Sequence, residues 1–139
     1  MPSPDKPAQP EIGFILAKLR VAAKANRLPL GTYELPDVKS GKRVIRPELS
    51  EMPRHMSEEE RKRWKPRPLI CLYTETLCDI YERHAAGEYL SDTAHHKECH
   101  EDIMTDGEAV LRAVWGQALN FKMRERRRRG QGAGEGVGE

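Results

Sequence analysis

Apolar side chains recur every three or four residues near the start of the chain, which is the spacing of one face of an α-helix. This pattern predicts a first helix over Glu11–Asn26. Pro10 suits its entry, and Pro29 with Gly31 ends it, because proline cannot continue the hydrogen bonding of a helix. The apolar face of this helix is expected to consist of Ile12, Ile15, Leu16, Leu19 and Ala23.

The second half of the chain predicts three further helices. Leu69–Ala86 is apolar around much of its circumference, which is typical of a buried central helix. Ser91 is a suitable cap for a helix over Asp92–Met104. Thr105 and Glu108 form a capping box, so a new helix is expected to begin there. Its apolar face comprises Val110, Leu111, Val114, Trp115, Ala118 and Leu119.

The stretch between these helices is less regular. Residues 32–46 contain two short extended runs on either side of Ser40–Gly41 and predict a short β-hairpin, whose prolines confine both strands to sheet edges. An extended basic linker over residues 32–56 is the alternative. Ser57 and Glu60 form another capping box and predict a short, polar helix.

Together these elements predict a mainly α fold. We expect a small antiparallel bundle of about four to five helices, because the connections near Gly87–Ser91 and Thr105–Gly107 are short. The chain of 139 residues suffices for one domain with one core, which we assign to residues 11–129. Residues 1–10 carry four prolines and residues 130–139 are half glycine, so both are expected to be disordered tails.

The net charge of +2 conceals a strong segregation of charge along the chain. Residues 1–67 carry fifteen basic and nine acidic side chains, whereas residues 68–111 carry two basic and ten acidic ones. Residues 112–139 carry seven basic and three acidic side chains. An acidic centre therefore lies between basic flanks, and a polyanion is expected to meet the flanks. The alternative is that these charges only solvate a small domain.

The end of the last predicted helix is rich in arginine. Guanidinium groups stay charged and bind phosphate in a forked geometry. No aromatic residue interrupts this run, so binding that is independent of base sequence is favoured over stacking on bases. Nuclear import, docking onto an acidic protein and simple solvation are the alternatives. The candidate phosphate-binding residues are Arg124, Arg126, Arg127, Arg128 and Arg129, assisted by Lys18, Arg20, Lys24 and Arg27 of the first helix.

A second candidate site is a cluster of histidine and cysteine in residues 95–100. Side chains four residues apart share a helix face, on which imidazole or thiolate groups can hold a metal ion. The spacing matches no standard zinc finger, and the alternative is that the histidines are solvated while the cysteines fill the core. The candidate zinc ligands are His96, Cys99 and His100, which Cys71, Cys78 and His84 of the preceding helix would complete.

Patterns typical of catalysis are missing from the sequence, which contains no H-E-x-x-H helix, phosphate-cradling glycine loop or nucleophile elbow. We therefore expect a protein that binds rather than catalyses and that needs no cofactor, zinc apart. The leading hypothesis is a nucleic-acid-associated protein, of the kind that serves as a viral or phage accessory protein. The alternatives are an adaptor that docks onto a protein partner through an acidic helical surface, and a zinc-stabilised helical module.

The sequence also favours a compartment inside the cell. No apolar stretch is long enough to span a bilayer, and the N-terminus lacks the basic start and apolar run of a signal peptide. The three cysteines are an odd number, which favours reduced thiols. We therefore expect a cytoplasmic or nuclear protein.

Overall fold

The computed structural model describes residues 10–37, 41–88 and 94–138, and within them every side chain except those of residues 94–97, 99 and 130–138. The chain is mainly helical, as predicted. None of the described helices combines the length and apolar character that crossing a membrane requires. The elements are α1 (Ile12–Lys24), β1 (Tyr33–Leu35), β2 (Arg43–Ile45), α2 (Glu58–Arg63), α3 (Leu69–Ala85) and α4 (Ala94–Gly138).

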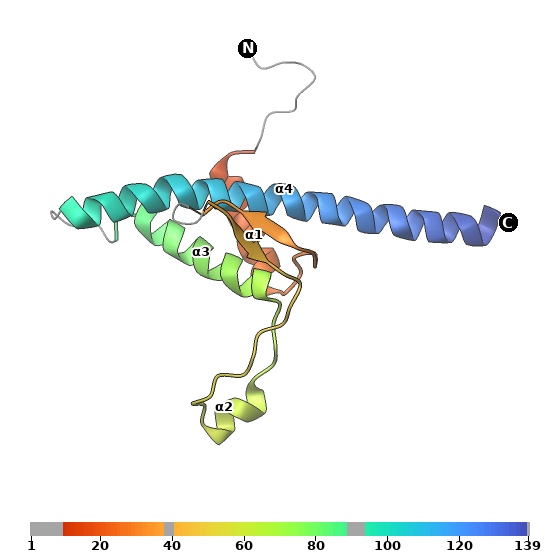
Figure 1. Ribbon diagram of the computed structural model, residues 1–139, viewed down its shortest axis with the longest axis horizontal. Coiled ribbons are helices and arrows are strands. Elements are labelled where there is room, and N and C mark those ends of the chain that lie inside the picture. The colour runs from red at the N-terminus through yellow and green to blue at the C-terminus, as the bar shows by residue number, and fades with distance from the viewer. Residues whose placement is uncertain (1–9, 38–40, 89–93, 139) are drawn as a thin grey trace, which may run out of the picture.

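The long helix α4 runs along the whole molecule; α3 and the hairpin lie below it in this view, and α1 crosses it (Figure 1). α3 leads towards the start of α4, so these two helices run in opposite directions. The short helix α2 sits at the end of a long loop, away from the other helices. The C-terminal part of α4 extends well beyond the packed elements.

The core forms where α1, α3 and α4 meet. The apolar face predicted for the first helix is confirmed, because Ile15, Leu16, Leu19 and Ala23 are buried. The predicted central helix, α3, is buried over more of its circumference than a single apolar face would be, as expected for a helix in the core. Its buried side chains are Ile70, Cys71, Thr74, Cys78 and Tyr81, which meet Val110, Leu111, Val114 and Ala118 of α4.

The predicted hairpin is confirmed, and it closes one side of this core. β1 and β2 are antiparallel, with Tyr33 opposite Ile45, and both of these side chains are buried. Residues 38–40 of the predicted turn lie outside the described part of the chain, whereas Gly41 has a φ of 78° that favours glycine. The hydroxyl of Tyr33 donates to the carbonyl of Pro29 (2.6 Å), so the loop after α1 is fixed to the first strand.

The capping box predicted before α2 is also confirmed. The amide of Glu60 donates to Oγ of Ser57 (3.2 Å), which satisfies one of the free amides at the helix start. None of the residues of α2 is buried, so local capping and helix-dipole interactions, rather than packing, hold this helix.

The break predicted at Thr105–Gly107 is wrong, and α4 is one continuous helix. A Cβ atom on Gly107 would lie 3.1 Å from Cδ2 of Tyr81, so glycine allows α3 to approach α4 closely instead of making a turn. Glu108, which was expected to cap a new helix, forms an ion pair with Arg112 one turn further on (3.0 Å). The described residues therefore form four helices, which is within the predicted four to five.

The predicted tails fall largely on residues of which the structure says little. Residues 1–9 lie outside the described part of the chain. The backbone of α4 continues to Gly138, but the side chains of residues 130–138 are not described, and neither is Glu139. The disordered tails therefore stay a prediction.

Thr74 provides a test of this core. Its hydroxyl is fully buried, and no described residue forms a hydrogen bond with it. Thr74→Val keeps the shape of the side chain and removes a hydroxyl that loses its water on folding without gaining a hydrogen bond. We therefore expect the free energy of unfolding to rise by about 1 kcal/mol. Urea unfolding of this variant measures the change. Thr76→Val, at an exposed position of the same helix, is the control and should change it by less than about 0.5 kcal/mol. A loss of stability in Thr74→Val would contradict this description of the core.

Candidate functional site

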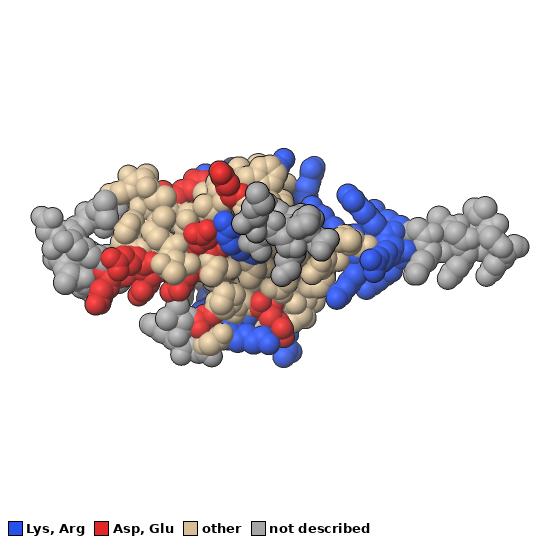
Figure 2. Space-filling view, turned by 90° about the horizontal axis from the view of Figure 1, so that it is seen from above, with Lys and Arg blue, Asp and Glu red and all other residues tan. Residues whose placement is uncertain are grey.

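The arginine-rich segment occupies the part of α4 that extends beyond α1 and α3 (Figure 1). Arg124 and Arg126–Arg129 are all exposed, and Figure 2 shows basic side chains gathered at this end of the molecule. None of the ion pairs between described residues involves any of these five arginines. The positive charge of this segment is therefore not neutralised by the carboxylates of the folded body.

These arginines surround the helix instead of forming one basic face. Successive residues of an α-helix are turned by about 100°, so five arginines within six positions point in different directions around the axis. Lys122 adds one more exposed cation, and Glu125 is the single acidic residue among them. The segment is a rod with positive charge on every side.

The hairpin fixes the point at which this rod leaves the body. The side-chain amide of Gln117 accepts from the backbone amide of Glu34 and donates to its carbonyl, both at 2.8 Å. The rings of Tyr33 and Phe121 pack edge to face with centroids 5.0 Å apart. Burial raises the pKa of Tyr33 well above its ordinary value, so this phenol stays protonated. Contacts with β1 therefore hold α4 one turn before the first arginine.

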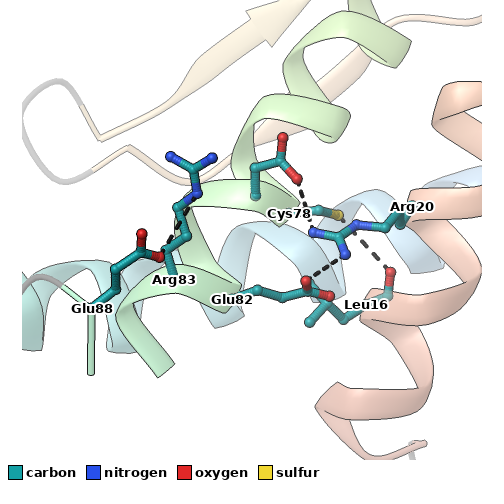
Figure 3. A network of polar contacts seen from close by, with 7 residues as sticks. Leu16, Arg20, Cys78, Glu82, Arg83 and Glu88 are labelled. Carbon is teal, nitrogen blue, oxygen red and sulfur yellow. Dashed lines mark hydrogen bonds and ion pairs between the residues drawn. The ribbon is translucent and has the colours of Figure 1, made fainter. Parts of the chain in front are cut away.

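The first helix supplies only part of the basic surface predicted from its sequence. The guanidinium of Arg20 faces α3, where it pairs with Asp79 (2.9 Å) and with Glu82 (Figure 3). Lys18 lies over the ring of Phe14, 5.5 Å from its centroid, whereas Lys24 and Arg27 are exposed. None of the polar or ring contacts of the described residues joins these four side chains to the arginine-rich end. Arg20 thus acts as a link between two helices.

The cysteines of α3 lie in the core. Cys71 and Cys78 are fully buried free thiols, and Cys78 donates weakly to the carbonyl of Leu16 (4.0 Å, Figure 3). Burial raises the pKa of Cys78 to about 11, so it stays a neutral thiol at physiological pH. A buried neutral thiol is suited to packing rather than to metal binding.

The structure brings together one histidine pair from the predicted metal cluster. Nδ1 of His100 lies 3.3 Å from Nδ1 of His84, at the junction of α3 and α4. Burial, with a contribution from His100, lowers the pKa of His84. The side chains of His96 and Cys99 lie outside the described residues. Among the residues that are described, no group of three or more potential metal ligands occurs, so the zinc site stays a prediction.

The N-terminal half of α4 carries the opposite charge. Glu98, Glu101 and Asp102 are exposed and Asp106 is half-buried, and no described residue forms an ion pair with any of them. Acidic side chains gather on this end of the molecule, opposite the basic end (Figure 2). One helix therefore holds unneutralised acidic and basic groups at its two ends.

The sequence did not reveal a cleft beside this acidic half of α4. It has a volume of about 740 Å³ and lies between the hairpin, α3 and α4. Leu77, Ile80 and Val110 give it an apolar floor, with Asp102 and Asp106 at its edge. The spacing of Asp102 and Asp106, one helical turn apart, was the only signal available, because the other lining residues come from separate elements.

The role of Arg20 can be separated from binding. The side chain of Arg20 is 28% exposed, and those of its partners Asp79 and Glu82 are 50% and 36% exposed. The two ion pairs should therefore contribute only modestly to the free energy of unfolding. We expect Arg20→Gln to lower the free energy of unfolding by about 1 kcal/mol and to leave affinity for heparin, a polyanion probe, unchanged. Lys24→Gln, at an exposed position of the same helix, is the control and should leave stability unchanged. If Arg20→Gln weakens heparin binding with no loss of stability in urea, Arg20 belongs to the binding surface.

Comparison of the chain with known protein families, with curated proteins and with solved structures finds no match. The feature that stands out is the separation of two unneutralised charged groups, of opposite sign, along α4.

Proposed function

We propose that this protein binds nucleic acid without catalysing a reaction, and that the arginine-rich end of α4 contacts the phosphates. One observation carries this proposal. Five exposed arginines, with no ion pair to any described carboxylate, surround a helix that stands clear of the body. A dense group of unneutralised guanidinium groups attracts polyanions, and the release of counterions from the nucleic acid drives the binding.

The arrangement of the arginines favours a double-stranded partner. An α-helix with its side chains is about 10–12 Å wide, which matches the major groove of B-form DNA at about 12 Å. A helix in that groove faces phosphates on both walls, so cations on every side of the helix can be used. A basic stripe on one face would have suited a flat anionic surface instead.

The same segment offers little for reading bases. Phe121, the aromatic residue nearest to the arginines, packs against Tyr33 and is not a free platform for stacking. Arginines that contact phosphates fix the position of a protein on the duplex but carry no sequence information. We therefore propose binding that is independent of base sequence, in the cytoplasm or nucleus.

A salt series tests this proposal. Fluorescence anisotropy with a duplex of about 20 base pairs should give a logarithm of affinity that falls with the logarithm of salt concentration, with a slope of about −4. Replacing Arg126, Arg127, Arg128 and Arg129 together by Gln should make that slope less steep by about 3.6, because each lost phosphate contact removes about 0.9 from it. A single strand of equal length should bind more weakly.

A matched control comes from α2 and the residues just after it. Arg61, Lys62, Arg63 and Lys65 are four exposed cations remote from α4, and their joint replacement by Gln changes the net charge by the same amount. This control should keep most of the affinity and of the salt slope. Equal losses in both variants would show that only net charge matters, and an unchanged slope in the arginine variant would remove the proposed site.

A further inference from the structure

One face of α4 carries exposed side chains from residue 98 to residue 127. It borders the hairpin at Asp102 and Ala109, which line clefts together with Pro36 and Asp37. We call it the outer stripe. Its residues follow one another at steps of three or four, apart from one step of seven between Ala109 and Gly116, so they lie in line on the helix. The buried residues Leu111, Val114 and Ala118 lie on the opposite face. The outer stripe consists of Glu98, Asp102, Thr105, Ala109, Gly116, Asn120, Met123 and Arg127, all of which are exposed.

The outer stripe changes in character from one end to the other. It begins with the acidic residues Glu98 and Asp102, continues with small or uncharged residues, and ends with Met123 and Arg127. A Cβ atom on Gly116 would meet nothing within 4 Å, so the stripe is open to close approach by another backbone at this residue.

The positions of the stripe are symmetrical about a point between Arg112 and Ala113. Residues 98 and 127 are equally far from that point, and so are 102 and 123, 105 and 120, and 109 and 116. Two α4 helices can lie antiparallel and cross at this point, so that a two-fold axis relates them. Glu98 of each helix then faces Arg127 of the other. Ala109 then faces Gly116, and such small residues let two helices approach closely.

The residues that flank the stripe match in the same register. In antiparallel helix pairs, positions on the same side of the contact meet, which brings Glu101 near Arg126 and Asp102 near Arg124. Near the axis, the two copies of Arg112 are alike in charge, but each is already paired with Glu108 of its own chain (3.0 Å).

We propose that two copies of this chain form a symmetrical dimer through the outer stripe, with their α4 helices antiparallel. The acidic and basic ends of one α4 cannot neutralise each other, because Asp102 and Arg127 are about 38 Å apart along a single helix. A second copy supplies both complements at once, and such a contact closes on itself. Parallel pairing would set acid against acid and base against base, so the charges also specify the orientation.

The dimer and a polyanion would compete for the same side chains. Arg124, Arg126 and Arg127 lie in or beside the contact, so a bound duplex excludes the second copy from them. The dimer does not depend on the proposed function, since its partners are carboxylates of the chain itself. The acidic end of one copy thereby shields the basic end of the other until a polyanion displaces it.

Sedimentation velocity of the full chain and of charge-reversal variants tests whether the chain dimerises through the outer stripe. At about 50 mM salt, wild-type protein should dimerise, and at about 500 mM, where the screening length falls to about 4 Å, the dissociation constant should rise at least tenfold. The acid-end variant (Glu98→Lys, Glu101→Lys, Asp102→Lys) and the base-end variant (Arg124→Glu, Arg126→Glu, Arg127→Glu) should each be monomeric. Their equimolar mixture should dimerise again, because one α4 is then basic along the stripe and the other acidic.

Controls separate this result from misfolding and from net charge. Arg61→Glu, Lys62→Glu and Arg63→Glu together change three exposed cations of α2 and should leave the dimer intact. Circular dichroism should show that every variant keeps its helix content. A wild-type chain that is monomeric at both salt concentrations would overturn the proposal, and so would folded variants that do not reassociate on mixing.

Disulfide formation tests the register, with Cys99 replaced by Ser in all samples. Ala109→Cys mixed with Gly116→Cys should form a cross-linked dimer, and each variant alone should form much less. Self-cross-linking of Ala109→Cys alone would indicate a parallel pair and would overturn the antiparallel register. Duplex binding by the acid-end variant keeps the two proposals apart, because a monomer that still binds DNA has lost the dimer but not the proposed function.

Discussion

The close packing of α3 against α4 at Gly107 is the constraint on which the rest of the molecule depends. A Cβ atom on residue 107 would lie 3.1 Å from Cδ2 of Tyr81, so a glycine here lets the two helices pack closely without a shift of the tyrosine ring. The helix continues through this point, where its sequence suggests a break. Because α4 continues, its acidic first half and its arginine-rich end are held apart on one rod. The continuity of α4 therefore determines both how the helices are arranged and how far apart the acidic and basic groups lie.

The sequence predicted most of the fold, because periodic apolar residues and capping boxes act locally. The helix from Glu11, the hairpin around Gly41, the Ser57 cap and the buried helix from Leu69 all form where expected. The break at Thr105 was wrongly predicted, since the same Thr-to-Glu spacing and the same glycine are compatible with a turn and with a close helix contact. Only the position of Tyr81, on another helix, decides between them.

The site was predictable where it depends on a run of residues and not where it depends on tertiary neighbours. The arginines after Phe121 needed no partner to be recognised, and the structure leaves them exposed. Arg20 looked the same as Lys24 in the sequence, but it meets Asp79 and Glu82 from α3. The outer stripe was hidden for the same reason, because which face of α4 remains open depends on what covers the others.

A distance measurement tests the continuity of α4 most directly. Spin labels on Glu101→Cys and Arg128→Cys, in a chain with Cys99→Ser and diluted with unlabelled protein at high salt, report the separation of the acidic and basic ends within one molecule. A single continuous helix predicts one narrow distribution near 40 Å, since 27 residues rise by about 1.5 Å each. A broad distribution, or one centred well below about 30 Å, would show that α4 bends or breaks near Gly107. The arginine-rich end could then fold back onto the acidic half, which would contradict the account.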